Sequence, residues 1–119
     1  MGASAEEAIA KCVEQLHTAN RQRQAWGELP AVQSKNEAVK ALGARLQRDH
    51  TLIDQALMQY AGANEIVLKD APLPAAPIAK LEGSRFDAAF LATIDRNNAA
   101  MARTVDACLM LTAEPQARP

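Results

Sequence analysis

The sequence predicts an all-α bundle of three long helices and one short helix, forming a single domain over residues 1–119. Hydrophobic residues make up 49% of the chain but aromatic residues only 3%. Small and aliphatic side chains must therefore fill the core, which suits closely packed helices better than strands. Three capping boxes, each a Ser followed three residues later by an acid, mark helix starts. They are Ser4 with Glu7, Ser34 with Glu37, and Ser84 with Asp87.

The apolar residues recur with a helical period in each long segment. The expected helices cover residues 5–26, 35–61 and 85–111. The first is expected to end at Gly27, because Leu29-Pro30 prevents continuation, and the second at Gly62. The inward positions are Ile9, Cys12, Val13, Leu16 and Ala19, then Val39, Leu42, Leu46, Ile53, Leu57 and Tyr60, then Phe86, Phe90, Ile94, Met101, Val105 and Cys108.

The segment 63–74 predicts a long crossover between the second and third long helices, because prolines and its length argue against a tight hairpin. At ~3.3 Å per residue it spans up to ~40 Å, about the length of a helix of ~25 residues. The second and third helices are therefore expected to be parallel. Within the crossover, Ile66-Val67-Leu68 is interpreted as apolar packing against the bundle, with a short strand as the alternative. A short helix is expected over 78–81, and 113–119 is expected to be a disordered tail.

Cys12 and Cys108 lack the CxxC spacing of zinc and dithiol sites. They are either two small buried hydrophobes or a disulfide. The crossover topology makes the first and third helices antiparallel, which brings both cysteines to one end of the bundle. An up-down-up arrangement would separate them too far for a bridge. The crossover topology therefore predicts a Cys12–Cys108 disulfide in an oxidising compartment.

Charge and hydropathy exclude two classes of partner. The formal net charge is −1, and no basic cluster of the kind that binds nucleic acid is present. No apolar run approaches the roughly 20 residues of a membrane span. The N-terminus carries neither a basic nor an apolar signal segment, so a secreted form would have lost its signal peptide already.

The segment NEAVKALGARLQRDHTLID, residues 36–54, resembles the second helix of a ferritin-like family of predicted bacterial periplasmic or outer-membrane proteins of unknown function. Residues 86–91, FDAAFL, resemble the opening of a later helix in that family, and the resemblance covers roughly residues 36–106. It implies a ferritin-like bundle with a long crossover, and residence in the periplasm or secretion. The chain departs from the family where a second Asp-His falls on Asn97 and Asn98, and where a closing helix is expected.

The polar residues Asp49, His50, Asn97 and Asn98 are predicted to form a polar core layer that fixes helix register. In this layer Asp49 or His50 is expected to hydrogen-bond to Asn97. Because ferritin-like dimetal sites use several Glu residues and Glu-x-x-His pairs, which this sequence lacks, no metal and no other cofactor is expected. Amide side chains are also poor ligands for zinc or iron.

The alternative to this polar layer is a reduced metal-binding or stress-related protein whose ligands are His17, Asp49 and His50. Arg23, on the first helix, would repel a metal there. His17 itself is expected on a solvated edge.

No enzymatic constellation is present, since neither cysteine has a histidine at helical spacing and no glycine-rich phosphate loop occurs. Three long helices enclose a bundle less completely than four, which leaves an apolar groove for the short helix, a second copy of the chain or a partner helix. Trp26, beside Leu29, is either a lid on the core or an exposed anchor for a partner, and the lid is favoured.

The sequence therefore predicts a non-enzymatic binding protein of the bacterial envelope that caps or inhibits a protein partner. A homodimer or structural assembly subunit is the further alternative.

Overall fold

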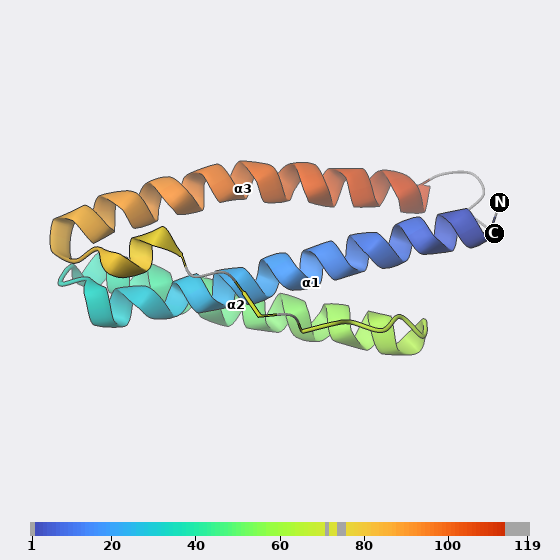
Figure 1. Cartoon of the computed structure of the whole chain (residues 1–119), viewed down its shortest axis with the longest axis horizontal. Helices are drawn as coiled ribbons and strands as arrows, with labels where there is room; N and C mark the ends of the chain where they lie inside the picture. The colour runs from blue at the N-terminus through green and yellow to red at the C-terminus, as the bar shows by residue number, and fades with distance from the viewer. Residues whose placement is uncertain (1, 71, 74–75, 114–119) are drawn as a thin grey trace.

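The computed structural model describes residues 2–70, 72–73 and 76–113, and these form an all-helical bundle (Figure 1). The elements are α1 (Gly2–Gln33), α2 (Glu37–Ala63), the 3₁₀ helix η1 (Pro77–Lys80) and α3 (Gly83–Ala113). The bundle is elongated, with extents of 52 × 23 × 21 Å. Helix α3 includes Ala113, and the rest of the expected tail lies outside the described residues.

Helix α1 is the central element: it packs along α2 and, less extensively, along α3, whereas α2 and α3 make few contacts with each other. Figure 1 shows α2 returning antiparallel to α1, the crossover running back along the bundle, and α3 parallel to α2. The predicted crossover topology is confirmed. Ile66-Val67-Leu68 forms no strand, and Val67 is 77% exposed, so only its two neighbours are partly buried.

Helix α1 continues through Gly27 and Pro30, and its predicted end at Gly27 is wrong. At Gly27 the helix instead passes very close to α2, since a Cβ there would lie 2.6 Å from the Gly43 carbonyl oxygen. A Cβ on Gly43 would lie 2.6 Å from Cγ of Pro30. Both glycines allow the two backbones to approach, and the buried Pro30 ring fills the space that Gly43 leaves.

The start of α2 also differs from the expected capping box. Asn36 is the N-cap, and its side chain accepts hydrogen bonds from the backbone N–H groups of Ala38 and Val39 at 2.9 and 3.2 Å. Ser34 Oγ instead accepts a bond from the Asn36 N–H at 3.1 Å. Because Asn and Ser are about equally good N-caps, the segment SKNE offers two starts, and the structure uses the second.

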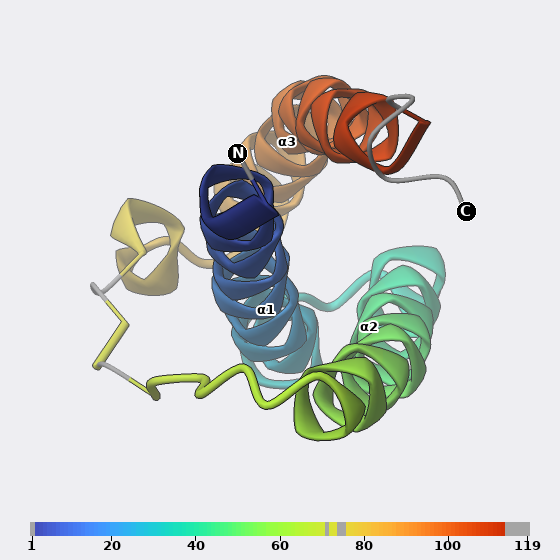
Figure 2. The same ribbon diagram turned by 90° about the vertical axis from the view of Figure 1, so that its right-hand side faces the viewer.

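The apolar core lies at the end of the bundle where η1 meets α3. It consists of Trp26, Val39, Leu46, Ile78, Phe86, Phe90 and Ile94. The rings of Phe86 and Phe90 stack with their centroids 5.4 Å apart. Gln33 secures η1 by donating its side-chain amide to the carbonyls of Ile78, Ala79 and Leu81. The short helix therefore closes this end of the molecule, on the face of α1 away from α2 (Figure 2).

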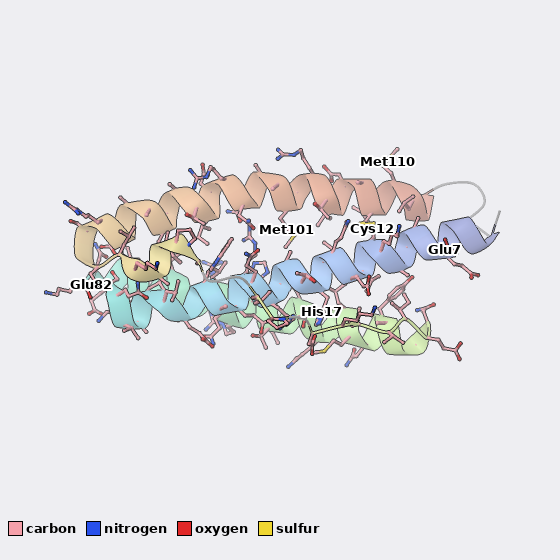
Figure 3. All side chains as sticks on the ribbon, in the orientation of Figure 1. Glu7, Cys12, His17, Glu82, Met101 and Met110 are labelled. Carbon is pink, nitrogen blue, oxygen red and sulfur yellow. A yellow bond between two sulfur atoms is a disulfide. The ribbon has the colours of Figure 1, made fainter. Side chains whose placement is uncertain are left out.

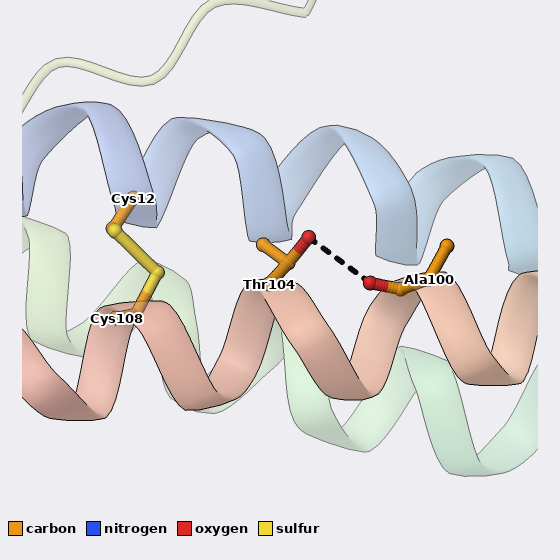
Figure 4. Close-up of a disulfide and its surroundings, with 4 residues drawn as sticks. All are labelled: Cys12, Ala100, Thr104 and Cys108. Carbon is orange, nitrogen blue, oxygen red and sulfur yellow. Dashed lines mark hydrogen bonds between the residues drawn. A yellow bond between two sulfur atoms is a disulfide. The ribbon is translucent and has the colours of Figure 1, made fainter.

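The opposite end of the bundle is held by a disulfide between Cys12 of α1 and Cys108 of α3 (Figure 4). The two Cα atoms are 5.8 Å apart, within the range that a disulfide requires. The predicted bridge is confirmed, and it rests on the predicted topology, because only antiparallel α1 and α3 place these positions side by side.

Candidate functional site

An apolar groove opens between α2 and α3, with α1 as its floor. Figure 2 shows the three helices in an open arrangement, in which α2 and α3 both flank α1 but do not close against each other. The groove contains a cavity of about 180 Å³ beside the disulfide. Its lining is Ile9, Cys12, Val13 and Leu16 from α1, Leu57 and Tyr60 from α2, and Val105, Cys108 and Leu109 from α3.

The walls of this groove expose apolar side chains that the sequence pattern placed in the core. On α2, Tyr60 is 44% exposed, and on α3, Val105 is 37% exposed. Within the described residues no further helix covers this face. The helical period therefore predicts the shared face of these side chains, but their predicted burial is wrong. The short helix does not fill the groove either, because it packs against α3 on the other side of α1.

A buried arginine lies between α1 and α3, midway along the bundle. Arg23 is 2% exposed. It donates from Nε to Oδ1 of Asn97 at 3.0 Å and from Nη1 to Oδ1 of Asn98 at 2.8 Å. Burial lowers the pKa of the guanidinium from its ordinary value. The predicted layer thus contains both asparagines, but a cation from α1 is their partner instead of Asp49 or His50.

His50 contributes to the same layer through a different contact. Its Nδ1 lies 2.7 Å from Oδ1 of the buried Asn20, and because an amide oxygen only accepts, Nδ1 carries the proton. Burial, with the nearby charge of Arg23, lowers the pKa of His50. Asp49 does not belong to the layer: it is exposed and lies 3.6 Å from Nε of Arg45 one turn earlier on α2. A charged carboxylate stays hydrated at little cost on the outside of a helix.

A second polar cluster joins α1, α2 and the crossover through His17. Its Nδ1 lies 2.6 Å from Oδ1 of Asp54, and its Nε2 lies 2.7 Å from Oδ1 of Asp70. His17 is 3% exposed, so its predicted place on a solvated edge is wrong. Figure 3 shows His17 where the crossover passes α1. Asp70, a residue of the crossover, contacts the ring at Nε2. The helical period used to place His17 describes positions within one helix, so it could not predict this contact.

The protonation of His17 follows from these two contacts. Burial of the ring opposes the charged form, but hydrogen bonds and charge attraction from Asp70 and Asp54 outweigh it, and the pKa of His17 is raised. Both ring nitrogens face carboxylate oxygens, which accept and do not donate, so the imidazolium satisfies both contacts. The hydrogen bond to His17 lowers the pKa of Asp70. The charged contacts of His17 with Asp54 and Asp70 therefore hold the crossover against α1 and α2.

The alternative metal ligands His17, Asp49 and His50 are not brought together. Each histidine is engaged in a separate cluster, and Asp49 lies on the outside of α2. Among the described residues, no three Asp, Glu, His or Cys side chains converge in a way that suits a metal ion.

The two predicted partner anchors both lie at the core end of the bundle. Trp26 is 9% exposed and belongs to the core cluster, as the lid interpretation expected. Leu29 is half-buried and packs against the same cluster. Neither lines the groove between α2 and α3.

Opposite pH dependences are expected for the two histidines. Because its pKa is raised in the folded protein, His17 stabilises the fold fully at a pH below 6.5, the ordinary pKa of histidine. This contribution is lost as the pH rises through the pKa of His17 in the folded protein. A lowered pKa makes His50 contribute above 6.5, with loss as pH falls. In urea unfolding between about pH 5 and 9, a range in which histidines titrate, His50→Gln should become less stable as pH rises. His17→Gln should become less stable as pH falls.

Matching slopes in the two variants would contradict this assignment of protonation states. The chain contains two histidines, so each variant leaves a single imidazole to titrate, and NMR titration of that ring provides an independent check.

Fold and site together define a small, disulfide-bonded, three-helix protein with an open apolar groove. The chain belongs to the family described as Domain of unknown function (DUF4142), whose model matches residues 2–116. No curated protein matches the chain, and no solved structure does. Within the described residues, no helix combines the length and hydrophobicity of a membrane span.

Proposed function

We propose that this protein is a non-enzymatic binding protein of the bacterial envelope, and that its groove between α2 and α3 receives an amphipathic helix of a protein partner. By occupying that helix, the protein caps or inhibits its partner. The observation that carries the proposal is the exposure of apolar side chains on both groove walls, Tyr60 on α2 and Val105 and Leu109 on α3. Exposed apolar stripes of this kind mark interaction surfaces in proteins that otherwise bury their cores.

A helix is the occupant that the groove geometry favours. Helices α2 and α3 run parallel on either side of α1 (Figure 1), so a helix lying between them would run alongside both. On α2 the exposed apolar positions extend from Leu42 to Tyr60, a length of about 27 Å at 1.5 Å per residue. A partner helix of about 20 residues matches that length, and it would anchor through side chains three and four positions apart.

The topology supports the comparison with ferritin-like bundles. A long crossover between parallel second and third helices is one of the connections used in four-helix bundles of that class. In such a bundle a further helix would lie between α2 and α3, where this structure has its groove. The proposed partner helix therefore takes the place of a fourth bundle helix.

The disulfide supports residence in the periplasm or outside the cell. Disulfides persist in oxidising compartments and are reduced in most cytosols. The Cys12–Cys108 bridge also holds the groove walls in place, because it ties α3 to α1 next to the cavity.

Groove occupancy can be tested with a displayed library of amphipathic helices of about 20 residues, a length that spans the walls. Helices enriched on the wild-type protein should bind Leu109→Glu at least about tenfold more weakly, because a charge then enters the apolar contact. The matched control is Met110→Glu. Leu109 and Met110 are 59% and 64% exposed, but Leu109 lines the cavity and Met110 points away from α1 (Figure 3).

Equal binding to the two variants would contradict the proposal, as would failure to enrich any helix. Sedimentation velocity separates the remaining alternative: a stable dimer of the wild-type protein that dissociates in Leu109→Glu would assign the groove to a second copy of the chain.

A further inference from the structure

The polar layer between α1 and α3 contains a charge without a counter-ion. Among the described residues, no carboxylate lies within 4.0 Å of Arg23, whose side chain is 2% exposed. Its Nε and Nη1 donate to the neutral amides of Asn97 and Asn98, and its Nη2 is buried with no hydrogen-bond partner. A buried charge is costly unless it is paired, and a buried donor that makes no hydrogen bond adds a further cost.

Sequence spacing places Arg23 on the face of α1 that lines the groove. Ile9 and Leu16 line the cavity from α1, and Arg23 follows them at the same interval of seven residues, which keeps it on the same face of the helix. On α3, Asn98 precedes the cavity-lining Val105 by seven residues. The hydrogen bond from Nη1 to Asn98 therefore directs the guanidinium from α1 toward the α3 wall of the groove.

We infer that the helix received by the groove carries an Asp or Glu near the centre of its apolar face, and that this carboxylate pairs with Arg23. The inference rests on the proposed function and specifies its partner. A carboxylate is the planar, doubly accepting group that the guanidinium fork binds best. Because the guanidinium is buried in the unbound protein, the carboxylate reaches Nη1 and Nη2 when the exposed Asn98 turns its amide to water.

The position of the charge explains how the groove discriminates among helices. Apolar side chains at the disulfide end bind any amphipathic helix of suitable length, whereas Arg23 favours a helix with one acid at the matching depth. A helix with an apolar residue there forms no ion pair with the guanidinium, and a helix with a basic residue repels it. The groove therefore favours the acidic helix through an ion pair that the other helices lack.

The inference is tested with one helix from the displayed library, synthesised with either Glu or Gln at the central position of its apolar face. Affinities are measured by calorimetry for wild-type protein, Arg23→Met, Arg23→Lys and Asn98→Ala, with circular dichroism of each variant as a check on folding. For the wild type, the Glu peptide should bind at least about tenfold more tightly than the Gln peptide. Arg23→Met should abolish that preference, and Arg23→Lys should retain part of it.

The exposed Asn98→Ala variant keeps the test informative if a substitution at the buried Arg23 prevents folding. Its preference for Glu should equal or exceed that of the wild type, because the competing amide is gone. Equal affinities of the wild type for the two peptides would overturn the inference and leave the proposed function intact. Absence of binding by both peptides would overturn the proposed function itself.

Discussion

Replacing Cys12 and Cys108 together by Ala is expected to lower the free energy of unfolding by about 4–5 kcal/mol, the amount that a loop of roughly 100 residues predicts. The bridge joins positions 96 residues apart in sequence, so the unfolded chain loses much conformational freedom when it is closed. The native structure offers little to compensate at this end, because its groove side chains are half exposed and the core cluster lies at the other end.

Urea unfolding of the double variant, compared with the wild type in reducing and non-reducing buffer, measures this effect. The reduced wild type should match the variant. Hydrogen exchange should show the loss concentrated in the second half of α3, whose first half remains anchored by Phe86 and Phe90. A double variant as stable as the oxidised protein would show that packing alone holds α3 in place.

Substitution of Gly27 by Ala is expected to cost about 3 kcal/mol, at the upper end for a side chain forced into a filled site. Its Cβ would lie 2.6 Å from the Gly43 carbonyl oxygen and 2.8 Å from the backbone nitrogen of Gln47. Both neighbours are backbone atoms of α2, so the two helices must separate. The intrinsic preference of Ala over Gly in a helix returns only about 1 kcal/mol.

The matched control is Gly62→Ala, also inside a helix. A Cβ on Gly62 would meet nothing within 4 Å, so the substitution should raise the free energy of unfolding by about 0.5–1 kcal/mol. Thermal and urea unfolding of the two variants provide the comparison. Shifts of the same sign would argue against the close approach of α1 and α2 at Gly27.

The topology was predictable from sequence because it depends on length. A crossover long enough to return along a whole helix fixes the directions of α2 and α3, and the pairing of Cys12 with Cys108 follows. Helix ends were less predictable, because local signals have more than one use. Gly27 and Pro30 are common helix terminators, but in this protein they form the contact with α2 at Gly43, a tertiary feature that no local pattern reveals.

The candidate site was predicted in outline only. The open groove follows from the number of helices, and the polar layer from Asn97 and Asn98. The partners of His17 were missed because Asp54 and Asp70 lie 37 and 53 residues away in sequence. Arg23 was recognised as a cation at the right depth, but its lack of a counter-ion depends on side-chain geometry across three helices.

A crystal structure of the protein bound to a helix selected by the wild type tests the proposed binding directly. We expect the helix to lie between α2 and α3, in contact with Tyr60 and Leu109, with a carboxylate at hydrogen-bond distance from Nη2 of Arg23. A helix bound elsewhere, or a groove filled by a second copy of the chain, would contradict it.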